Sequence, residues 1–265
     1  MINITTSFFL TLICIYTLTV SQAFAGNSIS TDINCKLQKA KEFYNQRENS
    51  ENLKLAIEEY KNILKQMPQG KEIYNKNCAE ILIELSKCCF KLAEYHVKDN
   101  NEKALWFETG EKYGREAISL DSNNVGGYYW MVQNIGEHGC ISKLYFLNKK
   151  NDFEEAIKKA RLLDNHKKPY DYSGVYRTLA AYYTPRFMWG DLDKALEYAK
   201  KMEDSPRYLI NLSVLADLYW KVDREMAKKY AKCVMNADLS KFPETQFENS
   251  IVQKDTTKKW RKLLE

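Results

Sequence analysis

A short helical face that recurs along the chain restricts the fold more than any other feature of the sequence. In the stretch GDLDKALEYAKKMEDSP, Ala195, Ala199 and Met202 are spaced four and then three residues apart, so their side chains share one face of a helix. Alanine at the first two positions indicates that a second helix packs closely against this face. The same spacing occurs four more times, at Ala56, Tyr60 and Ile63, at Gly110, Gly114 and Ala117, at Phe153, Ile157 and Ala160, and at Ala227, Ala231 and Val234.

A different helical pattern precedes three of these faces. It combines bulky, small and aromatic residues, and it covers Tyr128 to Ile135, Tyr176 to Tyr183 and Leu212 to Tyr219. Among the residues between the two patterns, Asp191 is placed to cap the helix after it, and Asp152 with Glu155 to form a capping box. The 265 residues include only 10 glycines and 5 prolines, which leaves room for long helices. The repeating unit is therefore predicted to be a helical hairpin.

This arrangement resembles the tetratricopeptide-repeat (TPR) family. The small-aromatic-small spacing followed by a proline is similar to the second helix of such a repeat, and Leu179-Ala180-x-x-Tyr183 and Leu215-Ala216-x-x-Tyr219 are similar to the first, with alanine in place of glycine. The resemblance covers about residues 33 to 237 and implies an all-α, helical-hairpin (TPR-like) repeat solenoid. We expect the repeat domain to span residues 26–245, followed by a C-terminal capping helix over residues 246–265.

A narrower resemblance is to the T component of TRAP-type (tripartite periplasmic) transporters. It rests on Gly127 to Trp130 in GGYYW, on Arg177, on Pro185 and on Gly190 to Tyr198 in GDLDKALEY. The resemblance implies a trimeric accessory subunit that associates with the substrate-binding protein of such a transporter, and a ligand that is an organic acid or an apolar molecule. The alternative that the sequence leaves open is a scaffold or assembly factor of an envelope complex without a small-molecule site.

The first 25 residues have the pattern of a signal peptide. They carry no charged side chain, are apolar from Phe8 to Val20, and end in Ala23-Phe24-Ala25, which is the small-x-small pattern read by a signal peptidase. We therefore expect cleavage before Gly26 and export to the periplasm or the outer surface, as a soluble or membrane-associated protein. The alternative is an uncleaved anchor, although the apolar run is short for a full membrane span.

Six cysteines would follow the cleavage site, namely Cys35, Cys78, Cys88, Cys89, Cys140 and Cys233. In an exported protein an even number suggests disulfides. However, Cys78, Cys88 and Cys89 lie in an apolar helical stretch, where cysteine often packs as a small core residue. We expect packing thiols, with room for one longer-range disulfide.

The concave groove of the predicted solenoid supplies the candidate binding residues. They are Tyr129, Trp130, Gln133, Asn134, Arg177, Asp217 and Lys221. Trp130 is an aromatic of the kind that more often packs in a core. Arg177 is suited either to clamp a carboxylate of a ligand or to pair with a nearby acid. Asp217 and Lys221 are four residues apart and could form an ion pair within one helix.

The sequence favours binding over catalysis. It lacks the HExxH, GxSxG and P-loop motifs, and no Cys/His spacing is typical of a metal site, so we predict no catalytic residue, no metal and no cofactor. Glu137-His138-Gly139-Cys140 places a base beside a thiol, but neighbours in sequence do not establish a shared site. The net charge of +5 comes from lysines interleaved with glutamates, which predicts solvated helix faces rather than a nucleic-acid site.

Overall fold

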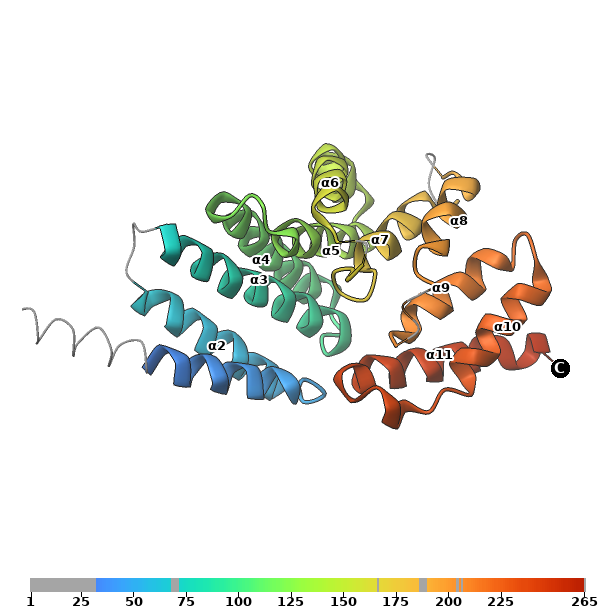
Figure 1. Ribbon diagram of the computed structural model, residues 1–265, viewed down its shortest axis with the longest axis horizontal. Coiled ribbons are helices and arrows are strands. Elements are labelled where there is room, and N and C mark those ends of the chain that lie inside the picture. The colour runs from blue at the N-terminus through green and yellow to red at the C-terminus, as the bar shows by residue number, and fades with distance from the viewer. Residues whose placement is uncertain are drawn as a thin grey trace, which may run out of the picture.

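The computed structural model describes residues 32–67, 72–165, 167–185, 190–203, 205 and 207–264, and in these residues it consists of helices and short connections without a strand (Figure 1). A helical segment over residues 32–45 comes first. The elements after it are α2 Ser50–Gln66, α3 Glu72–Tyr95, α4 Asn100–Leu120, α5 Val125–Ile141, α6 Lys143–Leu163, α7 Gly174–Tyr183, α8 Leu192–Lys200, α9 Leu209–Tyr219, α10 Arg224–Met235, the short 3-10 turns η1 Leu239–Lys241 and η2 Pro243–Thr245, and α11 Gln246–Leu264. The predicted all-α fold is confirmed, whereas the predicted signal peptide lies outside the described residues.

Successive helices pair into hairpins that stack into a curved row (Figure 1). Helices α4, α5, α6, α8 and α10 each begin after a capping residue whose side chain accepts a hydrogen bond from a backbone N–H of the first turn. The capping residues are Asp99, Asn124, Ser142, Asp191 and Asp223 respectively. The predicted cap at Asp191 is therefore confirmed. The predicted capping box at Asp152 is wrong, because α6 already begins at Lys143 and runs through Asp152 without a break.

The recurring small residues lie where the hairpins touch. Ala56, Ala117, Ala160, Ala195 and Ala231 are each at most 1% exposed, on α2, α4, α6, α8 and α10. These are the second helices of successive hairpins, as the spacing predicted. The wide spacing of the early repeats comes from the lengths of α3, α4 and α6, which have 24, 21 and 21 residues.

The closest approach that glycine permits is between α4 and α5. A Cβ atom added at Gly114 would lie 2.7 Å from Cβ and 2.9 Å from Cα of Met131, which is closer than real side chains come. Because the Met131 backbone cannot yield, the two helices can be this near only with glycine at position 114.

The apolar interior is divided among three clusters in the described residues. The largest joins residues 32–45 through α2, α3, α4, α5 and α6 to Val175, Leu179 and Tyr182 of α7. A second cluster begins with Tyr176 and Ala180, on another face of α7, and continues into α8, α9 and α10. A third, around Trp260 of α11, covers the far end of the row. Helix α7 therefore belongs to both halves of the molecule.

The cysteines are divided between the core and the surface. Cys88 and Cys89 are completely buried in the largest cluster, which confirms the packing role expected of them. Cys35, Cys140 and Cys233 are exposed, so a packing role is wrong for these three.

None of the helices in the described part of the chain combines the length and apolar character needed to cross a bilayer.

We predict opposite effects for alanine at two helical glycines. Alanine is the better helix former by about 1 kcal/mol. Gly114→Ala should nevertheless lower the free energy of unfolding by about 1–3 kcal/mol, because its methyl group collides with Met131. Gly136→Ala, whose methyl group meets nothing nearer than 3.6 Å, should raise the free energy of unfolding by up to about 1 kcal/mol. Urea unfolding followed by circular dichroism measures both, and a Gly114→Ala variant as stable as Gly136→Ala would contradict the close packing.

Candidate functional site

The inner curve of the solenoid encloses a cavity of about 600 Å³. Side chains from α3, α5, α7 and α9, the first helices of successive hairpins, form most of its wall, and α6 adds two phenylalanines. Its apolar and aromatic lining consists of Phe90, Tyr95, Tyr129, Trp130, Val132, Phe146, Phe153, Ala181, Tyr182, Tyr208, Ile210 and Val214. The volume and the lining are typical of a site that holds an apolar ligand or side chain.

Four of the predicted binding residues line this cavity. They are Tyr129, Trp130, Gln133 and Arg177. Asp217 and Lys221 instead line an adjoining hollow of about 190 Å³, which shares Ala181 and Val214 with the main cavity. The carboxylate of Asp217 accepts a hydrogen bond from Nζ of Lys259 in α11, at 2.5 Å, so its ion-pair partner comes from another helix and not from Lys221 as considered above. The binding role of all six stays a prediction.

Asn134 lies outside the cavity lining, although we predicted it as a groove residue. It is completely buried between α5, α3 and α4, and its amide donates to the carbonyl of Trp130 at 2.7 Å and to Oγ of Ser86 at 3.2 Å. On a helix, the residue after Gln133 points about 100° away from it. Asn134 therefore joins helices rather than facing a ligand.

Arg177 is already engaged by residues of its own chain. Its guanidinium donates to Oδ2 of Asp171 at 2.6 Å, to Oδ1 of Asn211 at 2.9 Å and to the hydroxyl of Tyr129 at 2.8 Å. The Tyr129 hydroxyl in turn donates to the same Asp171 oxygen at 2.6 Å. Of the two alternatives for Arg177, the structure contains the pair with a nearby acid.

Asp171 is held in this position by an unusual loop. Asp171, Tyr172 and Ser173, directly before α7, all have positive φ angles, of 46°, 53° and 66°. Such left-handed backbone costs energy for residues other than glycine. Asn211 of α9 supports the loop by donating to the carbonyl of Tyr172 at 2.7 Å.

A second cavity, of about 450 Å³, adjoins the first. It shares Lys91, Asp171 and Tyr208 with the main cavity, so these side chains stand between the two. Nζ of Lys91 donates to the Tyr208 hydroxyl at 3.2 Å. The outer wall of the second cavity is formed by the two ends of the row, with Tyr44, Arg47 and Lys87 on one side and Glu244, Thr245 and Glu248 on the other.

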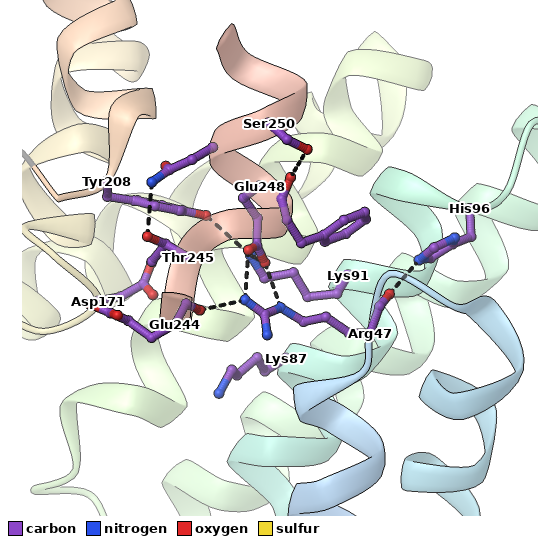
Figure 2. Close-up of polar contacts among 12 residues, drawn as sticks. Arg47, Lys87, Lys91, His96, Asp171, Tyr208, Glu244, Thr245, Glu248 and Ser250 are labelled. Carbon is purple, nitrogen blue, oxygen red and sulfur yellow. Dashed lines mark hydrogen bonds and ion pairs between the residues drawn. The ribbon is translucent and has the colours of Figure 1, made fainter. Parts of the chain in front are cut away.

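The two ends of the row meet in a buried ionic contact, which Figure 2 shows in detail. Arg47, beyond the first helical segment, donates from Nε and Nη2 to the two carboxylate oxygens of Glu248 at 2.8 and 2.7 Å. Nζ of Lys91 lies 2.9 Å from the same carboxylate. We call Arg47, Lys91 and Glu248 the clasp. No side chain of the clasp is more than 9% exposed.

An aromatic contact accompanies the clasp. The ring of Phe247 in α11 stacks almost parallel on His96, with centroids 5.8 Å apart, and meets the ring of Tyr95 edge-on at 5.4 Å. The sequence analysis missed Phe247 and Glu248 because they lie in FENS, a short and mostly polar stretch at the start of α11 that has no recognisable helical face.

The clasp controls the ionisation of Glu248. Burial would raise the pKa of its carboxyl group, but the ammonium of Lys91 and the hydrogen-bonded guanidinium of Arg47 outweigh burial and lower the pKa from 4.5 to about 2. Because the pKa is lower in the folded protein than in the unfolded chain, the clasp contributes its full stability above pH 4.5. That contribution is lost as the pH falls towards 2.

We predict that Glu248→Gln lowers the free energy of unfolding by about 3 kcal/mol at neutral pH, because it leaves two buried cations without their carboxylate. The difference from the wild type should shrink as the pH falls from 4.5 to 2, where Glu248 becomes neutral in both folded and unfolded protein. Urea unfolding across this pH range measures it.

The control is Glu225→Gln, which removes an exposed partner of Lys228. It should change stability by less than about 1 kcal/mol. A difference between the wild type and Glu248→Gln that does not depend on pH would refute the assignment.

The sequence Glu137-His138-Gly139-Cys140 does not form a joint site. His138 is 5% exposed and stacks on Tyr145 of α6 with ring centroids 3.6 Å apart, and burial lowers the pKa of its imidazole. Glu137 and Cys140 instead line the main cavity. The imidazole of His138 and the thiol of Cys140 therefore lie on different sides of α5. In the described residues, no group of three or more His, Cys, Asp or Glu side chains is arranged to hold a metal ion.

The comparison with solved structures defines the class of protein. The chain is similar to the crystal structure of a thermophilic TPR protein from Thermus thermophilus, with a TM-score of 0.57 over 83% of this chain and 98% of the other, at 16% sequence identity. The fold is therefore that of a TPR-like helical-repeat protein, as the sequence predicted.

The family is defined by the sequence of the N-terminal and central hairpins. Residues 36–170, about half of the chain, match the family described as regulator of microtubule dynamics protein 1-3, and the chain belongs to this family. It is a different family from the T component of TRAP-type transporters, and the comparisons give no support to that narrower resemblance. No curated protein matches the chain.

Proposed function

We propose that this protein is a helical-repeat binding protein whose main cavity takes up a neutral apolar group, presented by a protein partner or by a small molecule. The observation that supports the proposal is the cavity of about 600 Å³, whose wall gathers aromatic and aliphatic side chains from α3, α5, α6, α7 and α9. Burial of apolar surface there would drive binding.

The charges around the cavity favour a neutral group over an organic acid. Lys91 and Arg177 face the cavity, but Glu248 and Asp171 already accept from them at 2.9 and 2.6 Å. The remaining charged lining residues, Lys143, Glu94 and Glu137, bring no excess of positive charge. At Lys91 and Arg177 an incoming carboxylate would have to displace a carboxylate of the chain, which costs more than the exchange returns.

The fold and the family name both agree with a protein partner. Stacked helical repeats present extended inner surfaces on which partners bind. The family name describes its members as regulators of microtubule dynamics, and a regulator needs a partner to act on.

A more specific proposal comes from the sequence. Export rests on the signal-peptide pattern of the first 25 residues, and a trimeric assembly that associates with the substrate-binding subunit of a TRAP-type transporter rests on the resemblance at Arg177, at Pro185 and in GDLDKALEY and GGYYW. Co-elution of the protein with such a subunit at micromolar concentration would support this partner, and separate elution would remove it.

We predict that the full chain binds the neutral fluorophore N-phenyl-1-naphthylamine and that Ala181→Trp weakens this binding at least tenfold. Ala181 is an exposed residue of α7 that lines the cavity, so a tryptophan there fills the cavity without entering the core. Fluorescence titration measures the dissociation constant. Lys229→Trp is the control, because Lys229 is exposed on α10 and does not line the cavity.

The titration also distinguishes the alternatives. A wild type that does not bind the fluorophore would favour the scaffold without a small-molecule site. Equal weakening by Ala181→Trp and Lys229→Trp would place the fluorophore outside the cavity.

A further inference from the structure

The structure assigns to the clasp a second role: it is a releasable contact that holds the two halves of the solenoid together and sets the width of the inner curve. Only the consequence for binding in the main cavity rests on the proposed function. The opening itself is a property of the fold. Three observations carry the inference: the division of the core, the composition of the contact and its position beside the cavity.

The core divides the molecule into two halves that share one short helix. Residues 32–45 and α2 to α6 pack on Val175, Leu179 and Tyr182 of α7, whereas α8 to α10 pack on its Tyr176 and Ala180. Beside α7, the halves also touch at Tyr198 of α8, which packs on the first cluster and accepts a hydrogen bond from Arg161 of α6 at 3.0 Å. Helix α11 belongs to the second half, because Trp260 is buried among Ala216, Ala227 and Ala231 of α9 and α10. Opening the curved row therefore needs a rotation of one packed half against the other about the ten residues of α7 and the neighbouring contact at Tyr198.

The contact that opposes such a rotation consists of a few side chains. Across it, Arg47 and Lys91 bind Glu248, and Arg47 also donates to the carbonyl of Glu244 at 2.7 Å. Lys91 binds Tyr208, and Phe247 packs on Tyr95 and His96. Beside these residues lies the cavity of about 450 Å³, so the ends of the row meet over a hollow and not through a continuous apolar core. Such a contact can separate while each half stays folded.

The position of Lys91 connects the clasp with binding. Its ammonium lies 2.9 Å from Glu248, and its side chain lines both cavities. Tyr208, which accepts from Lys91, lies on the second half at the start of α9. When the clasp opens, Lys91 stays with α3 and Tyr208 moves with α9. The two side chains that stand between the cavities therefore move apart. The open form then offers a wider, wetter groove in place of the partly enclosed, largely apolar cavity.

Small-angle X-ray scattering of the full chain tests the opening without a ligand. A compact chain of this length has a radius of gyration of about 18 Å. Glu248→Gln and Arg47→Gln should each raise it by at least about 1 Å, with unchanged helical circular dichroism, whereas the control Glu225→Gln should leave it unchanged. If either buried-charge variant does not fold, Phe247→Ala decides, because it weakens the same contact without leaving a buried charge unpaired. Folded clasp variants with the wild-type radius would overturn the inference.

Titration with N-phenyl-1-naphthylamine tests the consequence for binding. The clasp variants should bind the fluorophore at least threefold more weakly than the wild type and Glu225→Gln. A raised radius with unchanged affinity would overturn the coupling to the main cavity. If the wild type itself does not bind the fluorophore, the proposed function fails, and the scattering result still decides whether the clasp opens.

Discussion

Close contact between helices is the constraint on which this structure depends. A helical hairpin exposes an apolar face that only the next hairpin can cover, and the covering helix comes near enough only where a side chain is small or absent. Gly114 against the backbone of Met131 is one example, and the buried alanines of the other second helices serve the same purpose. Because the second helices take up this packing, the first helices are left to line the inner curve and its cavity.

The fold was predictable because its determinants are local. The spacing of Ala195, Ala199 and Met202 predicts a helical face directly, and the recurrence of this spacing predicts a stack of helical hairpins. The same reasoning placed Tyr129, Gln133 and Arg177 on the inner curve, since they lie on the first helices. It failed one residue away, at Asn134, where the turn of the helix directs the side chain against Ser86 of α3 and Gly110 of α4. Helical periodicity identifies the residues at the centre of a helical face reliably, but it does not show to which neighbour a residue at the edge of that face points.

The clasp could not be predicted from periodicity. Glu248 and Arg47 are ordinary charged residues in polar stretches, and only the curvature accumulated over all the hairpins brings them together. The partners of Arg177 illustrate the same limit. Asp171 reaches the guanidinium through three left-handed residues without a glycine, which no turn motif in the sequence announces.

The sequence separation of 201 residues between Arg47 and Glu248 has a consequence for how the chain acquires its structure during synthesis. Hairpins that pack on their neighbours can assemble in the order in which they leave the ribosome. The guanidinium of Arg47 stays hydrated until α11, which carries its partner Glu248, has been synthesised. Joining the ends of a disordered loop this long would cost about 5 kcal/mol in entropy. Here the intervening hairpins have already folded, so the nascent solenoid itself carries the two ends towards each other.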